Sequence, residues 1–228
     1  MPIDNSIIHL AIAMASFVLL HFLMSGPFRK PLMSALGTQA FLLVYSLVSL
    51  CTFSWGAVAF DMATHTAPLW NGMHPLAWTI GSLLTIAAIA LILPSFARNP
   101  ALPGAKASGL GTVIPSGVFV ITRHPMMWGF SLWALGHIIV APQLRVIIFM
   151  GALILLGLLG SHFQDKRKLA QNKREFEPWQ RRTTFWLNLR RLGNIGVVWV
   201  IAVIVWFIAT VIHWELFGIP AGLWLLLS

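Results

Sequence analysis

The sequence predicts an all-α integral membrane protein, a polytopic helical bundle with about six transmembrane helices in one domain over residues 1–228. Three observations support this fold class. Hydrophobic residues make up 58% of the 228 residues and charged residues only 9%, which leaves more apolar surface than a soluble domain of this length can bury. The apolar residues gather in stretches of roughly 20, the length that a helix needs to cross a bilayer. The net charge of +9 is concentrated between particular stretches.

Six stretches qualify as spans by hydropathy. They cover residues 6–24, 39–60, 74–93, 125–141, 145–161 and 195–217. The fourth and fifth are short and are joined by a tight turn at Pro142. We expect the first to remain as a helix, because no Lys or Arg precedes Arg29 and the positive region of a cleaved signal peptide is missing. The apolar tail 219–228 is too short to span, so we expect it to pack at the interface.

The cations predict the orientation of the chain. All but one of the 15 Lys and Arg residues fall in loops on the same side. These are Arg29, Lys30, Arg98, Lys106, Arg123, Lys166, Arg167, Lys168, Lys173, Arg174, Arg181, Arg182, Arg190 and Arg191. Only Arg145 falls on the other side, so the positive-inside bias predicts that both termini lie outside. The charge also indicates a basic surface that faces membrane lipid, and we expect no binding of nucleic acid.

Two of the inner loops are long. Residues 94–123 carry several prolines and glycines that exclude a long helix. Residues 162–193 mix nine cations with Trp179, Phe185, Trp186 and Leu189, a composition typical of a segment that lies on an anionic membrane face. The alternative is a basic anchor that only sets the topology. The single cysteine, Cys51, cannot form an intramolecular disulfide, and we expect it to be a small buried hydrophobe.

A group of polar residues is expected to meet at the inner side. By their depth, Arg123, His124, His162 and Asp165 come together near His21. A fixed cation, imidazoles and a carboxylate suit the binding of an anion or the transfer of protons, and a helix that starts at the following proline offers free N–H groups. We therefore predict catalytic roles for Arg123, His124 and Asp165. The alternative is that Arg123 anchors the helix at the headgroups and His124 makes local hydrogen bonds.

His137 is a separate candidate. It lies 13 residues after His124, which corresponds to a rise of ~20 Å and a rotation of ~220° in a helix, so the two side chains cannot share one metal ion. His137 shares a helix face with Trp133 and Phe130, aromatic residues that suit a flat cofactor. Because paired cysteines are absent, histidines with aromatic neighbours favour b-type haem among metal cofactors. The alternative is a histidine that is hydrogen-bonded between helices.

Several motifs resemble a known family. They are "LLHFLMSGPFRKPL", "ARNPALPG", "ITRHPMMWGFSLWALGH" and "DKRK", in order over roughly residues 15–190. They resemble the NnrU family of bacterial membrane proteins, members of which are linked with denitrification and nitric oxide metabolism. The zeta-carotene cis–trans isomerase, a membrane enzyme with haem b held by two histidines, is similar to this family. The resemblance implies His21 and His137 as axial ligands of haem b, with Trp133 at the cofactor and His124 as an alternative ligand.

The resemblance implies three functions. The first is redox or cis–trans isomerase chemistry on a hydrophobic small molecule in the bacterial inner membrane. The second is methyl transfer, because the Arg-His-Pro helix start also resembles isoprenylcysteine and phospholipid methyltransferases. That motif usually continues x-Tyr-x-Gly, whereas this chain reads Met126-Met127-Trp128-Gly129, and Asp165 stands where those enzymes present paired glutamates. The third is a non-enzymatic accessory role in a denitrification complex.

Overall fold

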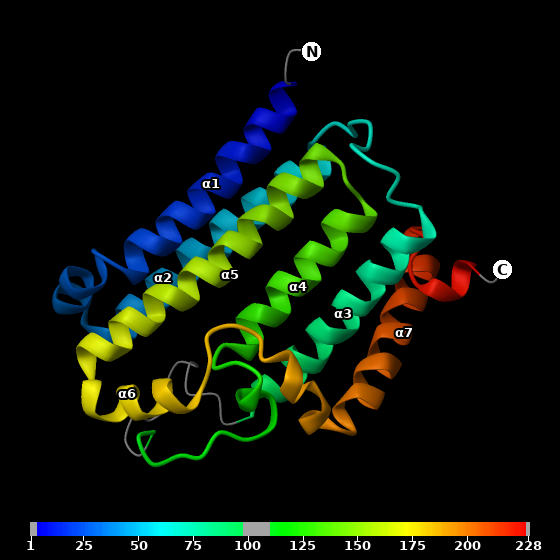
Figure 1. The fold of residues 1–228 in the computed structure, drawn as a ribbon. Coiled ribbons are helices and arrows are strands. Elements are labelled where there is room, and N and C mark those ends of the chain that lie inside the picture. Colours follow the sequence, from blue (N-terminus) through cyan, green and yellow to red (C-terminus); the bar gives the residue numbers. More distant parts are fainter. Residues whose placement is uncertain (1–3, 98–109, 227–228) are drawn as a thin grey trace.

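The computed structural model describes residues 4–97 and 110–226, and within them it contains only helices and connecting loops (Figure 1). The main helices are α1 (Asn5–Ser25), α2 (Arg29–Met62), α3 (Pro75–Ser95), α4 (Pro125–Val140), α5 (Leu144–Gln171), α6 (Lys173–Arg182) and α7 (Val198–Phe217). Three short 3-10 helices complete them: η1 (Gly117–Val120), η2 (Leu189–Ile195) and η3 (Leu223–Leu226). Five of the helices are long and apolar enough to cross a membrane, and α4 is a shorter apolar helix. The predicted all-α membrane bundle is confirmed.

Local sequence explains where several helices begin and end. Asp4 caps α1 by accepting a hydrogen bond from the Ser6 amide at 3.1 Å, and His74 caps α3 through its Nδ1 atom. Proline occupies the first turn of α3 and of α4, where its missing N–H group removes no hydrogen bond. Helix α7 ends at Gly218, which adopts the left-handed conformation.

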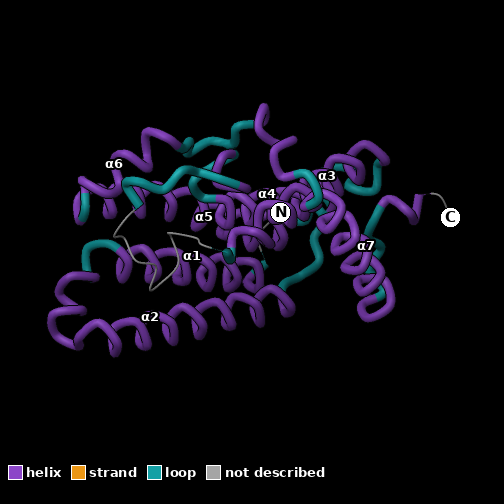
Figure 2. The backbone as a smooth tube through the Cα atoms, turned by 90° about the horizontal axis from the view of Figure 1, so that it is seen from below, coloured by secondary structure: helices purple, strands orange, loops and turns teal. Residues whose placement is uncertain are grey.

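The helices are neighbours in the order α2, α1, α5, α4, α3 and α7. Figure 2 shows the row from below, with α2 at one margin and α7 at the other. Helices α1, α3 and α5 end, and α2, α4 and α7 begin, at the same extreme of this row. We call it the basic end, because Arg29, Lys30, Arg123 and residues 162–193 lie there, and the other extreme the opposite end. Helix α6 and η1 also lie at the basic end (Figure 1).

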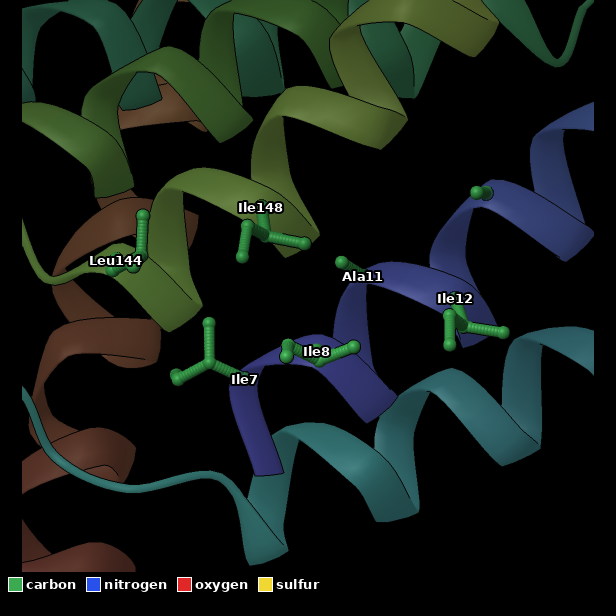
Figure 3. Close-up of a pocket in the computed structure, with 7 residues that line it drawn as sticks. Ile7, Ile8, Ala11, Ile12, Leu144 and Ile148 are labelled. Carbon is green, nitrogen blue, oxygen red and sulfur yellow. The ribbon is translucent and has the colours of Figure 1, made fainter. Parts of the chain in front are cut away.

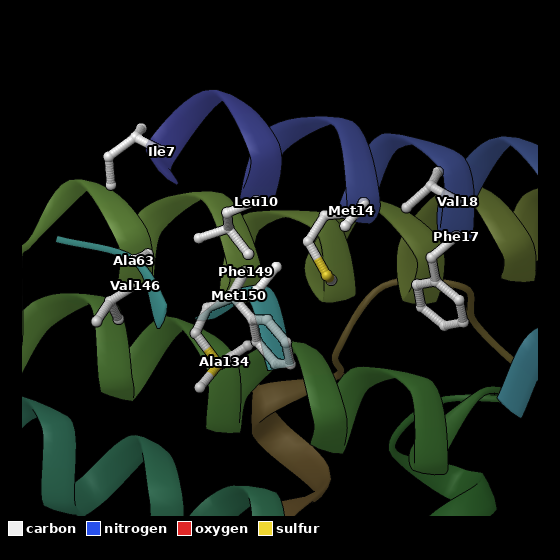
Figure 4. Close-up of a cluster of buried hydrophobic side chains, with 12 residues drawn as sticks. Ile7, Leu10, Met14, Phe17, Val18, Ala63, Ala134, Val146, Phe149 and Met150 are labelled. Atoms are coloured by element: carbon white, nitrogen blue, oxygen red, sulfur yellow. The ribbon is translucent and has the colours of Figure 1, made fainter. Parts of the chain in front are cut away.

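Two apolar clusters hold the row together. The first joins α1 to α5 and includes Leu10, Met14, Phe17 and Phe149 (Figure 4). The second lies at the basic end and joins α3, η1, α6 and α7. Because a bilayer surrounds the row, the lipid-facing sides of α2 and α7 remain apolar and exposed. Cys51 is exposed on α2, so the expectation that it is buried was wrong.

The basic loop 162–193 is more structured than its composition predicts. Residues 162–171 continue α5 as a helix beyond its apolar stretch. Helix α6 buries Phe176 and Trp179 in the second cluster, so this apolar face packs on protein rather than on lipid. Trp186 and Leu189 are both 67% exposed and, with the less exposed Phe163, remain available for a membrane interface. The tail folds back onto α7, where the Trp224 indole donates to Thr210 Oγ1 at 3.1 Å.

Helix α2 is interrupted at Gly37. Its φ of 78° and ψ of 163° are not helical and suit a residue without a Cβ. Residues 29–36 therefore form a short helical segment that turns away from the rest of α2, seen at the left of Figure 1. This break lets the guanidinium of Arg29 lie 5.2 Å from the centroid of the Phe41 ring, although 12 residues of unbroken helix would span about 18 Å.

Helices α3 and α4 approach each other closely at glycines. A Cβ at Gly129 would lie 2.9 Å from the backbone oxygen of Ala88, and one at Gly136 would lie 3.0 Å from the backbone oxygen of Gly81. Neither carbonyl can move without shifting its helix. Small residues of this kind permit tight helix packing in membranes, where lipid provides no hydrophobic drive for association.

Replacing Gly129 with Ala tests this close packing. Gly129→Ala should lower stability by about 1–3 kcal/mol through overpacking, measured as a lower midpoint of thermal unfolding in detergent. Gly151→Ala in α5 is the matched control, because nothing lies within 4 Å of a Cβ there, and it should leave the midpoint unchanged. Equal midpoints for both variants would contradict a tight α3–α4 contact.

Candidate functional site

A buried ion pair joins the start of α4 to the extension of α5. Asp165 Oδ2 accepts hydrogen bonds from Arg123 Nε and Nη2, each at 2.7 Å, and Asp165 Oδ1 lies 2.8 Å from His124 Nε2. The side chains of Arg123, His124 and Asp165 are 9%, 4% and 7% exposed. Arg123 and His124 therefore meet Asp165, about 41 positions later in the sequence, as predicted from their depth in the membrane.

The chain after α6 holds this site in place by backbone pairing. The Arg123 amide donates to the Thr184 carbonyl and the Asn188 amide donates to the Ile121 carbonyl, both at 2.8 Å. The hydroxyl of Thr122 and the indole of Trp128 both donate to the Phe185 carbonyl, at 2.8 Å each. Sequence reasoning had assigned residues 184–188 to a membrane surface, and no local pattern identified them as partners of the Arg-His-Pro segment.

The ring of Phe185 covers the site from the side. It packs edge-on against the His124 imidazole, with ring centroids 5.5 Å apart, and the Arg123 guanidinium carbon also lies 5.5 Å from its centroid. A cation over an aromatic face gains electrostatic stabilisation in an environment with little water. Phe185 therefore stabilises the buried guanidinium of Arg123.

The hydrogen bonds set the protonation of His124. An ionised carboxylate only accepts hydrogen bonds, so Asp165 selects the tautomer with hydrogen on Nε2. The other nitrogen, Nδ1, is then an unprotonated acceptor, and it is buried without a hydrogen-bond partner among the described residues. Burial lowers the pKa of His124 below its usual value, so the ring is neutral near pH 7. This arrangement resembles the histidine–aspartate part of a hydrolytic triad, with a basic nitrogen free for a ligand.

The carboxyl of Asp165 stays ionised. Burial alone raises its pKa, but hydrogen bonds and charges from His124 and Arg123 outweigh this and hold the pKa below its usual value. Lys168 adds a cation nearby, with its ammonium 5.8 Å from the centroid of Phe176. Burial lowers the pKa of Lys168 to about 8. The basic end therefore contains a compact set of groups that can bind, hold or move a proton.

His137 lies in the last turn of α4, near the opposite end. Its Nδ1 atom is 2.8 Å from the Trp133 carbonyl and its ring packs on the Trp133 indole, with centroids 4.5 Å apart. His213 on α7 has the same arrangement, with Nδ1 2.9 Å from the Ala209 carbonyl. The two histidines are also near enough for their charges to interact. When Nδ1 donates to a carbonyl, Nε2 is left as a metal ligand, the arrangement common around ligating histidines.

The structure brings His21 and His137 to different ends of the bundle. His21 contacts the hydroxyls of Tyr45 and Ser49 on α2. His21 lies near the far end of the apolar part of α5, because the next residue, Phe22, packs on Phe163 with ring centroids 5.4 Å apart. His137 lies near the start of α5, because the turn that follows it leads to Leu144. Between Leu144 and Phe163, α5 rises by roughly 28 Å.

The remaining histidines are in separate places. His162 is exposed on α5 and packs beside Phe163, so it does not join the Asp165 site. His9 accepts a hydrogen bond from the Trp55 indole at 2.9 Å, and His65 contacts Arg145. Among the described residues, no three His, Cys, Asp or Glu side chains converge as a group of metal ligands.

An apolar groove runs between α1 and α5 near the opposite end (Figure 3). Its volume is about 430 Å³, and aliphatic side chains alone line it. The lining residues are Ile7, Ile8, Ala11, Ile12, Ala15, Leu144 and Ile148. The groove holds none of the candidate site residues and offers no group for chemistry, so an acyl chain of the surrounding lipid suits it best.

Replacing Asp165 with Asn tests the buried ion pair. Asp165→Asn leaves the charge of Arg123 buried without a partner, which should cost about 3–5 kcal/mol of stability. The midpoint of thermal unfolding in detergent should fall accordingly. Glu177→Gln is the matched control, since it breaks the exposed pair between Glu177 and Arg181, an interaction worth less than about 1 kcal/mol. An unchanged midpoint for Asp165→Asn would show that the pair is solvated.

Comparison with known proteins supports the resemblance of the motifs. No curated protein and no solved structure matches the chain. The family described as NnrU protein matches residues 9–221, a range that contains His124, His137, helices α2 to α7 and all of α1 except its first four residues. Because this match covers most of the chain, the protein belongs to the NnrU family.

Proposed function

We propose that this NnrU protein binds haem b in the membrane and carries out redox or cis–trans isomerase chemistry on a hydrophobic small molecule. The observation that carries the proposal is the state of His137, whose Nδ1 is hydrogen-bonded to a backbone carbonyl and whose ring packs on Trp133. A role in nitric oxide or denitrification metabolism is part of the same proposal, because haem iron binds nitric oxide.

The ring nitrogens of His137 and His213 suit haem better than those of His21 and His137, the pair that the family resemblance implies. His137 and His213 each donate a hydrogen bond from Nδ1 to the carbonyl four residues earlier. The Nε2 atom of each ring is then available to bind iron. His21, in contrast, lies at the basic end with its ring nitrogens facing the hydroxyls of Tyr45 and Ser49. We therefore propose that His137 and His213, rather than His21 or His124, would hold the haem iron. Bound haem supplies a redox-active iron that coordinates small molecules.

His124 would act separately, at the basic end. Its free Nδ1 accepts a proton from a polar group, and Asp165 stabilises the imidazolium that results. Arg123 keeps Asp165 ionised and positioned during this transfer. The separation of ~20 Å along α4 means that His124 influences a proton-linked or anion-linked step rather than the haem itself.

Methyl transfer is a second candidate. Its support is that Arg123 and His124 contact a carboxylate from the next helix, Asp165. The methyltransferase resemblance implies a carboxylate at this place. Asp165 is already engaged by both residues, which leaves no free carboxylate there for S-adenosylmethionine. The accessory role without catalysis requires neither cofactor.

The absorbance spectrum of the purified protein tests these candidates. Protein from haem-replete cells should show a Soret band. His137→Ala should shift it from low-spin to high-spin or abolish it, because one of the two proposed histidine ligands is lost, and His124→Ala should leave it unchanged. His162→Ala is the matched control, since that ring is exposed. A protein that neither copurifies with haem nor binds added haem would contradict the proposal, and binding of S-adenosylmethionine would then favour methyl transfer.

The proposed location is the bacterial inner membrane, with both termini in the periplasm. Twelve of the 13 described cations lie at the basic end, and Arg98 and Lys106 lie outside the described residues. The positive-inside bias makes the basic end cytoplasmic. A reporter enzyme that is active only in the periplasm should therefore be active when fused to Ser228. The same reporter fused after Arg182, in the basic loop, should be silent. Activity in the second fusion and silence in the first would reverse the orientation.

A further inference from the structure

A second polar cluster lies at the basic end, between α1, α2 and α5. Arg167 on α5 donates from Nη1 to the Ser25 carbonyl at the end of α1, at 3.0 Å. Arg29, at the start of α2, lies over Phe41, and Phe41 stacks on Tyr45 with ring centroids 6.0 Å apart. The hydroxyl of Tyr45 in turn contacts His21. Three helices thus bring two guanidinium groups to one place.

The two arginines repel each other. Both residues lie at the turn between α1 and α2, because Arg167 donates to the Ser25 carbonyl and the Arg29 amide donates to the neighbouring Gly26 carbonyl at 3.2 Å. At this turn the two positive charges interact. Arg167 is partly buried, so water screens this repulsion less than at an open surface. Like charges held together in this way are unfavourable unless an anion lies between them.

The chain has no carboxylate to neutralise them. All six acidic residues lie in the described part of the chain. Asp165 is engaged by Arg123 and His124, Glu175 accepts from the Gly111 amide, and Glu177 pairs with Arg181. The other three are Asp4, Asp61 and Glu215, all at the opposite end. A counter-ion for Arg29 and Arg167 must therefore come from outside the protein.

We propose that Arg29 and Arg167 bind one phosphate oxyanion, carried by an anionic lipid or free in solution. A planar guanidinium matches the geometry of phosphate oxygens and forms paired hydrogen bonds with them. The end of α1 and the start of α2 lie where the apolar stretches stop, at the level of lipid headgroups. Tyr45 and Ser49 extend the polar surface towards the membrane interior. This site is independent of the haem proposal.

Lipid binding to the full chain tests the site. The protein is placed in nanodiscs of zwitterionic lipid with increasing phosphatidylglycerol, and retained lipid is counted by native mass spectrometry. Wild type should retain one anionic lipid at saturation. Arg29→Gln and Arg167→Gln should each weaken retention about tenfold, the effect of losing a hydrogen bond to a charged group. Because both arginines hold the same anion, the double variant should lose less than the sum of the two effects.

A stability measurement separates a binding site from a structural role. In purely zwitterionic lipid, Arg29→Gln should unfold at a temperature no lower than wild type, because it removes the repulsion from Arg167. Anionic lipid should then stabilise wild type but not the variant. The control is Arg181→Gln, an exposed arginine whose loss should change neither result.

Inorganic phosphate distinguishes the source of the oxyanion. If millimolar phosphate stabilises wild type in zwitterionic lipid as much as phosphatidylglycerol does, the site takes free phosphate. If only phosphatidylglycerol stabilises it, the site takes a lipid headgroup. The proposal is wrong if wild type prefers neither, or if Arg181→Gln lowers retention as much as Arg29→Gln, since that result indicates diffuse surface charge.

Discussion

The requirement that a buried charge be paired controls the basic end of this protein. Asp165 lies on α5, just beyond its apolar stretch, and it can remain ionised there only because Arg123 and His124 reach it. These two residues immediately precede α4, so the ion pair holds the start of α4 against α5. The backbone pairing of residues 121–123 with 184–188 then positions the chain that follows α6. Three segments distant in the sequence thus depend on one carboxylate.

Hydropathy and charge predicted most of the fold. The expected spans agree closely with the helices, because an apolar run of this length has few alternatives in lipid. Alternating depth also brought Arg123, His124 and Asp165 together without knowledge of packing. The extension of α5 was missed because hydropathy ends a span at the first cluster of charges, at Asp165 and Lys166. Nothing in residues 162–171 breaks a helix: they contain no proline or glycine.

The partners of the individual histidines could not be predicted. Depth places a residue along the membrane normal but does not give its rotation or the identity of its neighbour. His21 meets Tyr45 and not the Asp165 site because α1 packs between α2 and α5, away from the start of α4. The hydrogen bond that His137 and His213 share, from Nδ1 to the carbonyl four residues earlier, could not be predicted from the sequence either. Every histidine in a helix has such a carbonyl, and only packing decides which ring bonds to it.

The extension of α5 has a mechanical consequence. Asp165 and Arg167 are two residues apart on one helix, so their side chains point about 200° away from each other around its axis. One faces the start of α4 and the other faces the end of α1. A twist of this helix end that draws Arg167 towards its partners must carry Asp165 out of line with Arg123. An anion bound at Arg167 would therefore change the strength of the Asp165–Arg123 contact, and a ligand at Asp165 would change anion binding by the same free energy.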